Sequence, residues 1–218
     1  MSPRAAIRLQ ERLAGRVRVE RFRGRLRFVA GLDVAFSPDS ERCLAGVVVY
    51  DLRAGQAIEQ QLAWRPVRFP YVPGLLSFRE APAALAALRK LRCEPDVFMF
   101  DAQGIAHPRR LGLAAHVGLL IDRPSLGCAK SLLCGDYDEP PRQAGRHSPL
   151  VHRNETIGAV LRTCTDIKPV FVSVGHRLTL TDAVRIVMQC VTRYRLPEPA
   201  RLAHQLVTRH RADQTRDY

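Results

Sequence analysis

Two aspartates interrupt or end apolar runs in this sequence, where a charged side chain is costly. Asp33 lies within "VAGLDVAF" (29–36), and Asp101 directly follows "VFMF" (97–100). A carboxylate at the end of a buried strand stays charged only if something offsets the cost of its burial. The simpler interpretation is that Asp101 opens an ordinary turn and that Asp33 marks a bulge near Gly31.

The order of the expected strands favours contact between these aspartates. Residues 25–36, 43–52 and 56–67 predict three strands in an antiparallel meander, because the links between them are short. A capped helix over 77–91 leads to a strand at 96–100, which such a crossover returns parallel to the first strand. Two adjacent carboxylates in a sheet repel each other unless a cation lies between them. Oxygen ligands favour Mg²⁺, with Mn²⁺ as a substitute, over zinc.

The remaining segments predict further elements around the same sheet. We expect helices over 4–14, 112–121 and 179–194, strands over 125–130, 157–164 and 169–175, and a polar loop over 136–149. This order predicts a single mixed α/β domain over residues 1–218, with a three-strand antiparallel meander, parallel strands, and helices on both faces of the sheet. The almost wholly polar segment 209–218 is expected to be a frayed tail.

The charge balance favours a polyanionic partner. The 218 residues include 34 Lys+Arg against 21 Asp+Glu, for a formal net charge of +13, and nearly all of the basic residues are arginine. Arginine makes planar, bidentate contacts with phosphates, so nucleic acid is the favoured partner class. An arginine-rich proteome would produce part of the same excess.

The cysteine pattern predicts reduced thiols without a structural zinc, and the hydropathy predicts no membrane span. The six cysteines form no CxxC pair and have no histidine at zinc-finger spacing, so we expect no structural zinc. Reduced cysteines favour a cytoplasmic location. No segment is apolar for long enough to span a bilayer, and the N-terminus lacks the pattern of a signal peptide. A chain of this mass is expected to act as a monomer.

Four other polar residues could take part in chemistry, and each also has a structural explanation. Glu80 lies three residues after Ser77, the spacing of a capping box. His107 precedes a helix and could form only loop hydrogen bonds. Lys130 is one of very few lysines and suits a phosphate or an activated water, although a solvated lysine is equally reasonable. His116 lies on an apolar helical face, where a buried core histidine is expected.

Six stretches occur in a characteristic order along the chain. They are "GLDVAF", "PYVPGLLSFRE", "DAQGIAHPRRLGLAAHVGLL", "LGCAKSLLCG", "SVGHRLTL" and "YRLPEPARLAH". Together they resemble the endonuclease V family, the deoxyinosine 3′-endonucleases. The resemblance spans nearly the whole chain and implies a ribonuclease-H-like fold, in agreement with the strand order argued from the residues.

The resemblance implies an activity and a set of residues for it. Asp33, Asp101 and Glu80 match the family's metal-site acids, and His107 and Lys130 match its active-site histidine and lysine. The implied reaction is Mg²⁺-dependent or Mn²⁺-dependent hydrolysis of DNA on the 3′ side of deoxyinosine, the product of adenine deamination.

The resemblance also implies how the substrate is recognised. The match to the family's wedge, which fills the gap left by the damaged base, consists of Pro70, Tyr71, Val72 and Pro73, and the match to its base pocket includes Gly74, Leu76 and Gly112. His176 matches another family position near the metal site. Arg109 and Arg110 are expected to contact phosphates on the flanks.

One turn departs from the family pattern and keeps other functions open. Where many members read Asp-Gly-His-Gly, residues 101–104 read Asp-Ala-Gln-Gly. Ala102 alters the pocket if that position needs a positive φ, and Gln103 replaces a histidine with a neutral amide. The alternatives are a broader structure-specific nuclease, an inosine-specific endoribonuclease on single-stranded RNA, and a non-catalytic basic nucleic-acid-binding module. Burial of mutually repelling acids argues against the last of these.

Overall fold

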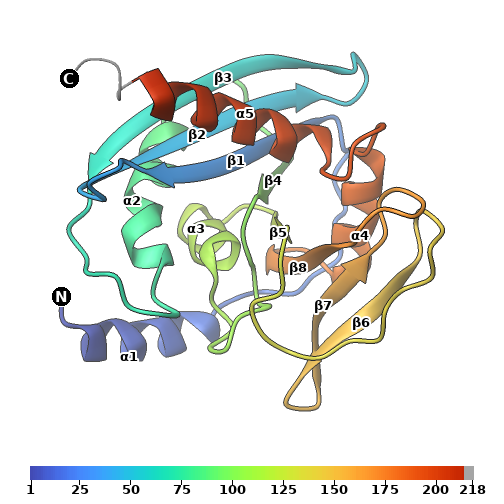
Figure 1. Cartoon of the computed structure of the whole chain (residues 1–218), viewed down its shortest axis with the longest axis horizontal. Coiled ribbons are helices and arrows are strands. Elements are labelled where there is room, and N and C mark those ends of the chain that lie inside the picture. The colour runs from blue at the N-terminus through green and yellow to red at the C-terminus, as the bar shows by residue number, and fades with distance from the viewer. Residues whose placement is uncertain (214–218) are drawn as a thin grey trace.

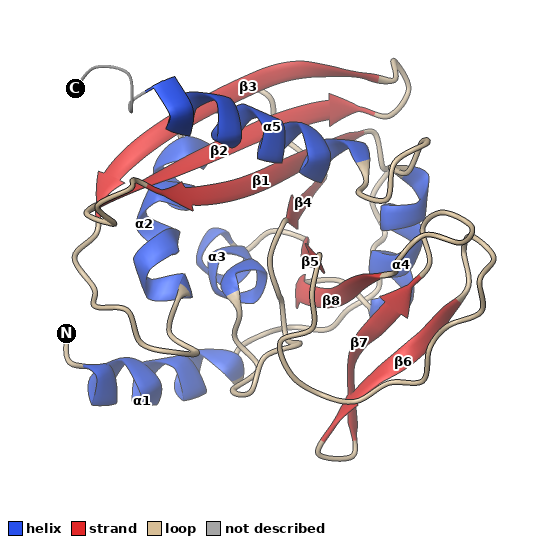
Figure 2. Cartoon of the chain, in the orientation of Figure 1, coloured by secondary structure: helices blue, strands red, loops and turns tan. Residues whose placement is uncertain are grey.

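The chain forms one mixed sheet with helices around it (Figure 1 and Figure 2). The computed structural model describes residues 1–213. The strands are β1 (Phe28–Phe36), β2 (Arg42–Asp51), β3 (Gln56–Pro66), β4 (Val97–Phe100), β5 (Ser125–Ala129), β6 (His147–His152), β7 (Glu155–Leu161) and β8 (Val170–His176). The helices are α1 (Pro3–Ala14), α2 (Ser77–Leu88), α3 (Leu113–Ile121), α4 (Leu180–Gln189) and α5 (Glu198–Asp213).

The strand order is β3-β2-β1-β4-β5-β8-β7-β6. Strands β1, β2 and β3 pair antiparallel, as the short links between them predict. Strand β4 pairs parallel with β1, with Leu32 opposite Phe100, and β5 pairs parallel with β4. Strands β8, β7 and β6 then add antiparallel pairs. The predicted mixed α/β architecture is confirmed.

Side chains of β1 and β4 alternate between two apolar layers. Leu32 and Phe100 belong to the cluster that contains α2 and α3, whereas Val29 and Met99 belong to the cluster that contains α4 and the start of α5. Helices therefore cover both faces, as expected. Because successive residues of a strand point to opposite faces, the residues after Leu32 and Phe100 are directed toward the α4 and α5 side.

Helix α5 lies directly against β1 and β2 (Figure 1). A Cβ added at Gly31 would lie 2.0 Å from the carbonyl oxygen of Pro199, and one at Gly46 would lie 2.6 Å from Cγ2 of Val207. The two glycines thus permit a helix-to-strand approach that a side chain would prevent.

The sequence analysis missed α5 because its apolar stripe is narrow. Ala203 and Leu206 pack on Val48, while most of the remaining helix surface is polar. The helix continues to Asp213 and so includes residues 209–213 of the segment expected to be a frayed tail, because extending a packed helix costs far less than starting one. The rest of that segment, 214–218, lies outside the described residues.

Strand β6 is a second element that the sequence analysis did not predict. It begins at His147, within the region expected to be a loop, and forms a hairpin with β7 through Arg153 and Asn154 at φ +56° and +62°. Pro149 is tolerated because β6 is the edge strand of the sheet. In residues 1–213, no helix is long and apolar enough to cross a membrane.

The contact between Gly31 and α5 gives a test of this packing. We expect Gly31→Ala to lower the free energy of unfolding by about 1–3 kcal/mol, because the added methyl group overpacks the interface with Pro199. Urea unfolding followed by circular dichroism measures the change. Gly15→Ala is the control, since its Cβ would meet only the carbonyl oxygen of Arg12, 3.8 Å away. Equal stability of the two variants would contradict the proposed close contact.

Candidate active site

The carboxylates of Asp33 and Asp101 lie side by side at one end of the β1–β4 pair. The backbone N–H of Asp101 donates to the carbonyl of Leu32 at 2.9 Å, which extends the parallel ladder by one residue. The side chains of Asp33 and Asp101 therefore project from neighbouring positions of the ladder, at the same level and toward the same face of the sheet. Their side chains are only 11% and 6% exposed. The strand order thus brings the two aspartates together, as argued from the sequence.

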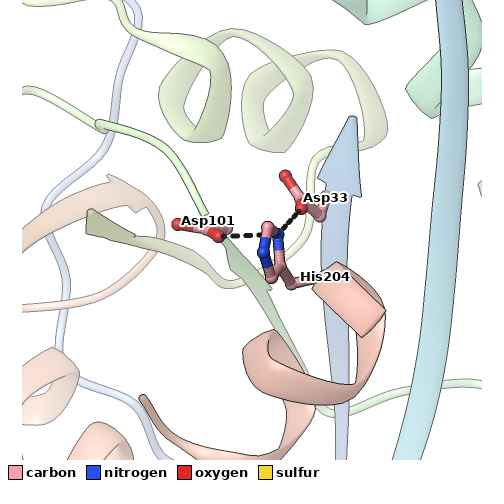
Figure 3. A group of neighbouring side chains, drawn as sticks. All are labelled: Asp33, Asp101 and His204. Atoms are coloured by element: carbon pink, nitrogen blue, oxygen red, sulfur yellow. Dashed lines mark hydrogen bonds and ion pairs between the residues drawn. The ribbon is translucent and has the colours of Figure 1, made fainter. Parts of the chain in front are cut away.

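His204 of α5 completes a group of three possible metal ligands. One ligand atom from each of Asp33, Asp101 and His204 lies within 4.8 Å of the other two. Figure 3 shows the three side chains pointing toward one another from β1, the end of β4 and α5. His204 Nδ1 lies 2.7 Å from Oδ2 of Asp33 and 3.9 Å from Oδ2 of Asp101.

The sequence analysis missed His204, although a signal for it was present. The stretch "YRLPEPARLAH" contributes to the family resemblance and ends on this histidine. Without a predicted helix there, nothing indicated that the side chain reaches the aspartates. The position of the His204 side chain depends on how α5 packs across β1, which is a tertiary contact.

Lys130, which follows β5, contacts Asp101 and His204. Its Nζ lies 2.5 Å from Oδ2 of Asp101 and 3.3 Å from Nδ1 of His204. Burial raises the pKa of Asp101, the charge of Asp33 raises it further, and the hydrogen bond from Lys130 opposes both effects. The two buried carboxylates therefore repel each other, and a bound cation would offset that repulsion.

Glu80 approaches the aspartates from α2. Burial and the charge of Asp33 raise its pKa to about 8, so the carboxyl is largely protonated at neutral pH. The capping explanation for Glu80 is not realised, because α2 begins after Leu76 without a side-chain cap. Glu80 is absent from the three-residue ligand group, so its carboxyl does not lie within 4.8 Å of the ligand atoms of both aspartates.

A cavity of about 770 Å³ joins the acids to most of the expected recognition residues. Its lining includes all five expected catalytic residues, namely Asp33, Glu80, Asp101, His107 and Lys130. It also includes Tyr71, Val72, Pro73, Gly74, Leu76 and Gly112. Pro70 and His176 are not part of this lining. Tyr71 is 69% exposed, so this part of the cavity presents a large aromatic side chain to solvent.

His107 is a buried, neutral ring in the wall of this cavity. Burial lowers its pKa to about 4, and a hydrogen bond with the backbone of Gly74 opposes the drop. Nδ1 accepts a hydrogen bond from the backbone N–H of Arg109 at 3.1 Å. The ring proton is therefore on Nε2, the nitrogen left to donate to Gly74.

Arg109 and Arg110 both form hydrogen bonds within the protein, and their expected contacts with flanking phosphates stay a prediction. Arg109 donates to the carbonyl of Gly74 and to the side chain of Gln10. Arg110 pairs with Glu155 and donates to the carbonyl of His152. Both guanidinium groups are used to hold loops of the protein together.

The departure at Ala102 and Gln103 fits this fold without backbone strain. Ala102 is not among the residues of the described chain with positive φ, and it packs against the cluster around α2 and α3. Gln103 Nε2 donates to the carbonyl of Ser131 at 2.9 Å. Both residues line the cavity, so they shape it without requiring the missing glycine.

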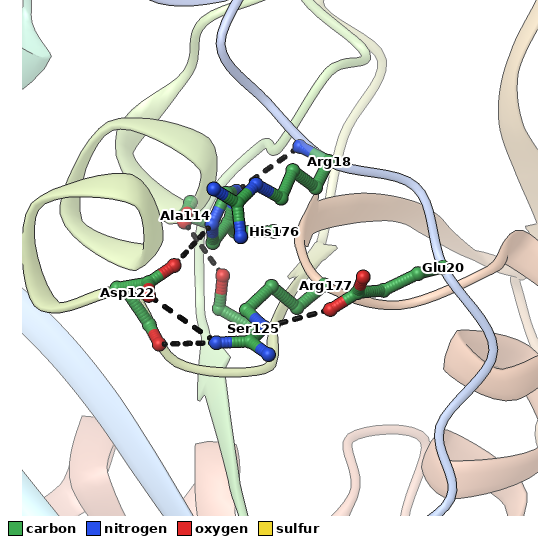
Figure 4. Close-up of polar contacts among 7 residues, drawn as sticks. All are labelled: Arg18, Glu20, Ala114, Asp122, Ser125, His176 and Arg177. Atoms are coloured by element: carbon green, nitrogen blue, oxygen red, sulfur yellow. Dashed lines mark hydrogen bonds and ion pairs between the residues drawn. The ribbon is translucent and has the colours of Figure 1, made fainter.

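His176 lies in a different cluster, contrary to the implied place near the metal site. It ends β8, which runs antiparallel to β5, so His176 pairs with Ser125 at the opposite end of the sheet from Lys130. Its Nε2 lies 3.0 Å from Oδ1 of Asp122, and its Nδ1 accepts from the backbone N–H of Arg18 at 3.2 Å. Figure 4 shows this cluster, in which Arg177 also contacts Asp122.

The position of His176 predicts a structural role. We expect His176→Ala to lower the free energy of unfolding by about 1–3 kcal/mol, because it leaves a cavity in place of a buried ring and removes the ring's bonds to Asp122 and Arg18. Divalent-ion binding by the aspartate pair should be unchanged. Thermal unfolding and Mn²⁺ titration measure the two effects, with the exposed His147→Ala as control. Loss of ion binding by His176→Ala alone would contradict this interpretation.

Comparisons with known proteins agree with the fold. A family model described as Endonuclease V matches residues 11–205. The endonuclease V of Roseiflexus castenholzii is 51% identical over 187 residues, which cover 86% of this chain and 83% of that protein.

Solved structures of that name share the whole architecture. The crystal structure of the endonuclease V from Streptomyces avermitilis has a TM-score of 0.93 and 39% identity, and the match covers 98% of this chain and 95% of that one. The endonuclease V of Ciona intestinalis, solved in complex with a 24mer DNA containing an inosine followed by a ribo-adenosine, has a TM-score of 0.80 and 25% identity over 93% of this chain and 95% of that one. By sequence and by structure, this chain belongs to the endonuclease V family.

Proposed function

We propose that this chain is a metal-dependent DNA repair endonuclease that recognises deoxyinosine and hydrolyses the phosphodiester bond on the 3′ side of the lesion. The observation that carries the proposal is one cavity that joins the Asp33–Asp101 pair to the exposed ring of Tyr71. Membership of the endonuclease V family supports the reaction, and the Ciona intestinalis relative solved with inosine-containing DNA supports the substrate.

The residues around the aspartate pair fit a divalent cation. Asp33 and Asp101 would hold the ion, His204 Nδ1 is close enough to add a ligand, and Glu80 would act from a greater distance. Two carboxylates favour Mg²⁺, with Mn²⁺ as a substitute. When bound, such an ion offsets charge on the phosphoryl oxygens and lowers the pKa of a coordinated water.

The remaining groups of the site have separate parts in this proposal. Lys130 is placed to hold a phosphate oxygen or the attacking water, because its ammonium group lies at the open side of Asp101. Glu80, with a pKa of about 8, can give up or take up a proton near neutral pH. His107 orients the cavity wall rather than transferring protons, since both of its ring nitrogens are already hydrogen-bonded.

Recognition requires the damaged base to leave the stack. That step costs a few kcal/mol, and less when the base is mispaired, so a cavity that accepts a displaced base favours damaged pairs. Tyr71 can stack in the vacated space, and Pro70 and Pro73 restrict the backbone on either side of it. Gly74, Leu76 and Gly112 would contact the displaced base, because they line the cavity beside the ring.

We also propose that the protein acts as a single domain and as a monomer in a reducing compartment such as the cytoplasm. The eight strands of the described residues form one sheet. All six cysteines are free, which fits reduced thiols.

Replacing either aspartate tests the metal site. We expect Asp33→Asn and Asp101→Asn each to slow nicking of inosine-containing duplex DNA by at least about 10²–10³-fold, because a carboxylate that holds the cation is lost. Binding of the same DNA in EDTA should largely persist. Single-turnover nicking in Mg²⁺ or Mn²⁺ measures the effect, with the exposed Asp166→Asn as a matched control. Normal turnover by either variant would exclude this site.

Replacing Tyr71 tests the wedge. We expect Tyr71→Ala to weaken binding of inosine DNA by about 5–150-fold, because stacking of this kind contributes about 1–3 kcal/mol. The nicking rate at saturating enzyme should change less. Fluorescence anisotropy on inosine duplexes, with matched RNA oligonucleotides for comparison, measures the affinities. Tyr194→Ala is the control, since Tyr194 lines a different cavity; equal losses in both variants would argue against the wedge.

A further inference from the structure

The wedge loop, defined here as residues 70–76, is held by the packing of Leu75 against α1 and by hydrogen bonds to one backbone carbonyl, that of Gly74. Gly74 has φ +77°, a conformation that favours glycine. Its carbonyl oxygen accepts hydrogen bonds from Nε2 of Gln10 at 3.0 Å and from Nη2 of Arg109 at 2.7 Å. A Cβ on Gly74 would lie 2.6 Å from that same Nη2, so the approach of Arg109 also depends on the missing side chain.

Gln10 connects this carbonyl to a second segment of the cavity lining, at Leu111. It belongs to α1 and is completely buried. The amide nitrogen that donates to Gly74 also donates to the carbonyl of Leu111 at 2.9 Å, and Oε1 accepts from Nε of Arg109 at 2.5 Å. One buried amide therefore links α1, the wedge loop and the segment that leads into Gly112. A glutamine is rarely so buried without a full set of partners.

These contacts hold in place residues of the cavity lining that would touch a displaced base. Gly74 and Gly112 both line the active-site cavity, whereas Gln10 does not. Tyr71 is exposed at the tip of the wedge loop, so the ring itself does little to order the loop. A loop that is already ordered pays less conformational entropy when the substrate binds. Anchoring Gly74 therefore favours recognition without any contact between Gln10 and the DNA.

We propose that Gln10 is a positioning residue for lesion recognition, which fixes the wedge loop at Gly74 to the neighbouring cavity segment at Leu111. Arg109 completes the clamp by bonding both Gln10 and Gly74. Gln10 lies just before residues 11–205, the part of the chain that the family model matches. The inference rests on the proposed function, because it assigns the clamp to recognition of the damaged base.

Two substitutions remove the clamp in different ways. Gln10→Met keeps the length of the side chain and removes every hydrogen bond. Gln10→Glu keeps the acceptor for Arg109 but loses both donors and places a carboxylate beside the carbonyls of Gly74 and Leu111. The matched control is Leu13→Ala, which removes a buried packing contact of the same helix with Leu111 and Ala115 but no hydrogen bond to the wedge loop.

Hydrogen exchange on the free protein tests the clamp without DNA or metal. We expect backbone amides of residues 70–76 to exchange at least about tenfold faster in Gln10→Met and Gln10→Glu than in the wild type, because anchoring bonds of this strength are lost. Leu13→Ala should lower the melting temperature and leave exchange in the wedge loop much closer to wild type. Unchanged exchange in both Gln10 variants would overturn the clamp.

DNA binding in EDTA then tests the role in recognition. Both Gln10 variants should bind inosine duplexes about tenfold more weakly and undamaged duplexes as well as the wild type does, with the nicking rate at saturating enzyme largely kept. A purely structural role predicts equal losses on both duplexes, or the same loss in Leu13→Ala, and either result would overturn the proposal. Absence of inosine preference in the wild type would instead overturn the proposed function, so the two failures are distinguishable.

Discussion

Two carboxylates on neighbouring strands cannot move apart, and the rest of the site depends on this constraint. Parallel pairing of β1 and β4 holds Asp33 and Asp101 at one level of the sheet, so separating them would break backbone hydrogen bonds. Burial strengthens their repulsion and raises the pKa of Asp101. Lys130 and His204 relieve part of the strain. Because the sheet keeps the two carboxylates from separating, their repulsion favours binding of a cation.

The same rigidity extends from the acids to the cavity through backbone contacts. Glycines at 31 and 46 allow α5 to lie on β1 and β2, and this contact carries His204 to the aspartates. On the other side, the carbonyl of Gly74 is tied to Gln10 and Arg109. Chemistry and recognition therefore share one cavity: α5, which lines it, carries His204 to the acids, whereas Gln10 of α1 supports Gly74 from outside the lining.

The histidines show how one residue type acquires different properties from its surroundings. Burial lowers the pKa of His107 and of His116 to about 4, so both rings are neutral hydrogen-bonding groups in the protein interior. His176 joins loops at the far end of the sheet. His204 is about half exposed, its side chain at 46%, and it is the one that reaches the aspartates. Only spatial position separates these roles.

The sequence alone determined the mixed sheet and the placement of Asp33 beside Asp101, because strand periodicity and short links are local properties. The expected recognition residues came instead from the resemblance to the family, and most of them line the cavity. The sequence did not determine α5, whose stripe of apolar residues is too narrow to be recognised without β1 and β2 beneath it. Hence His204 was missed. His176, which the resemblance implied to lie near the metal site, lies instead at the other end of β5 from Lys130, because β8 runs in the opposite direction to β5. Strand direction and helix docking join residues far apart in the chain, and so only the tertiary structure decided which histidine meets the acids.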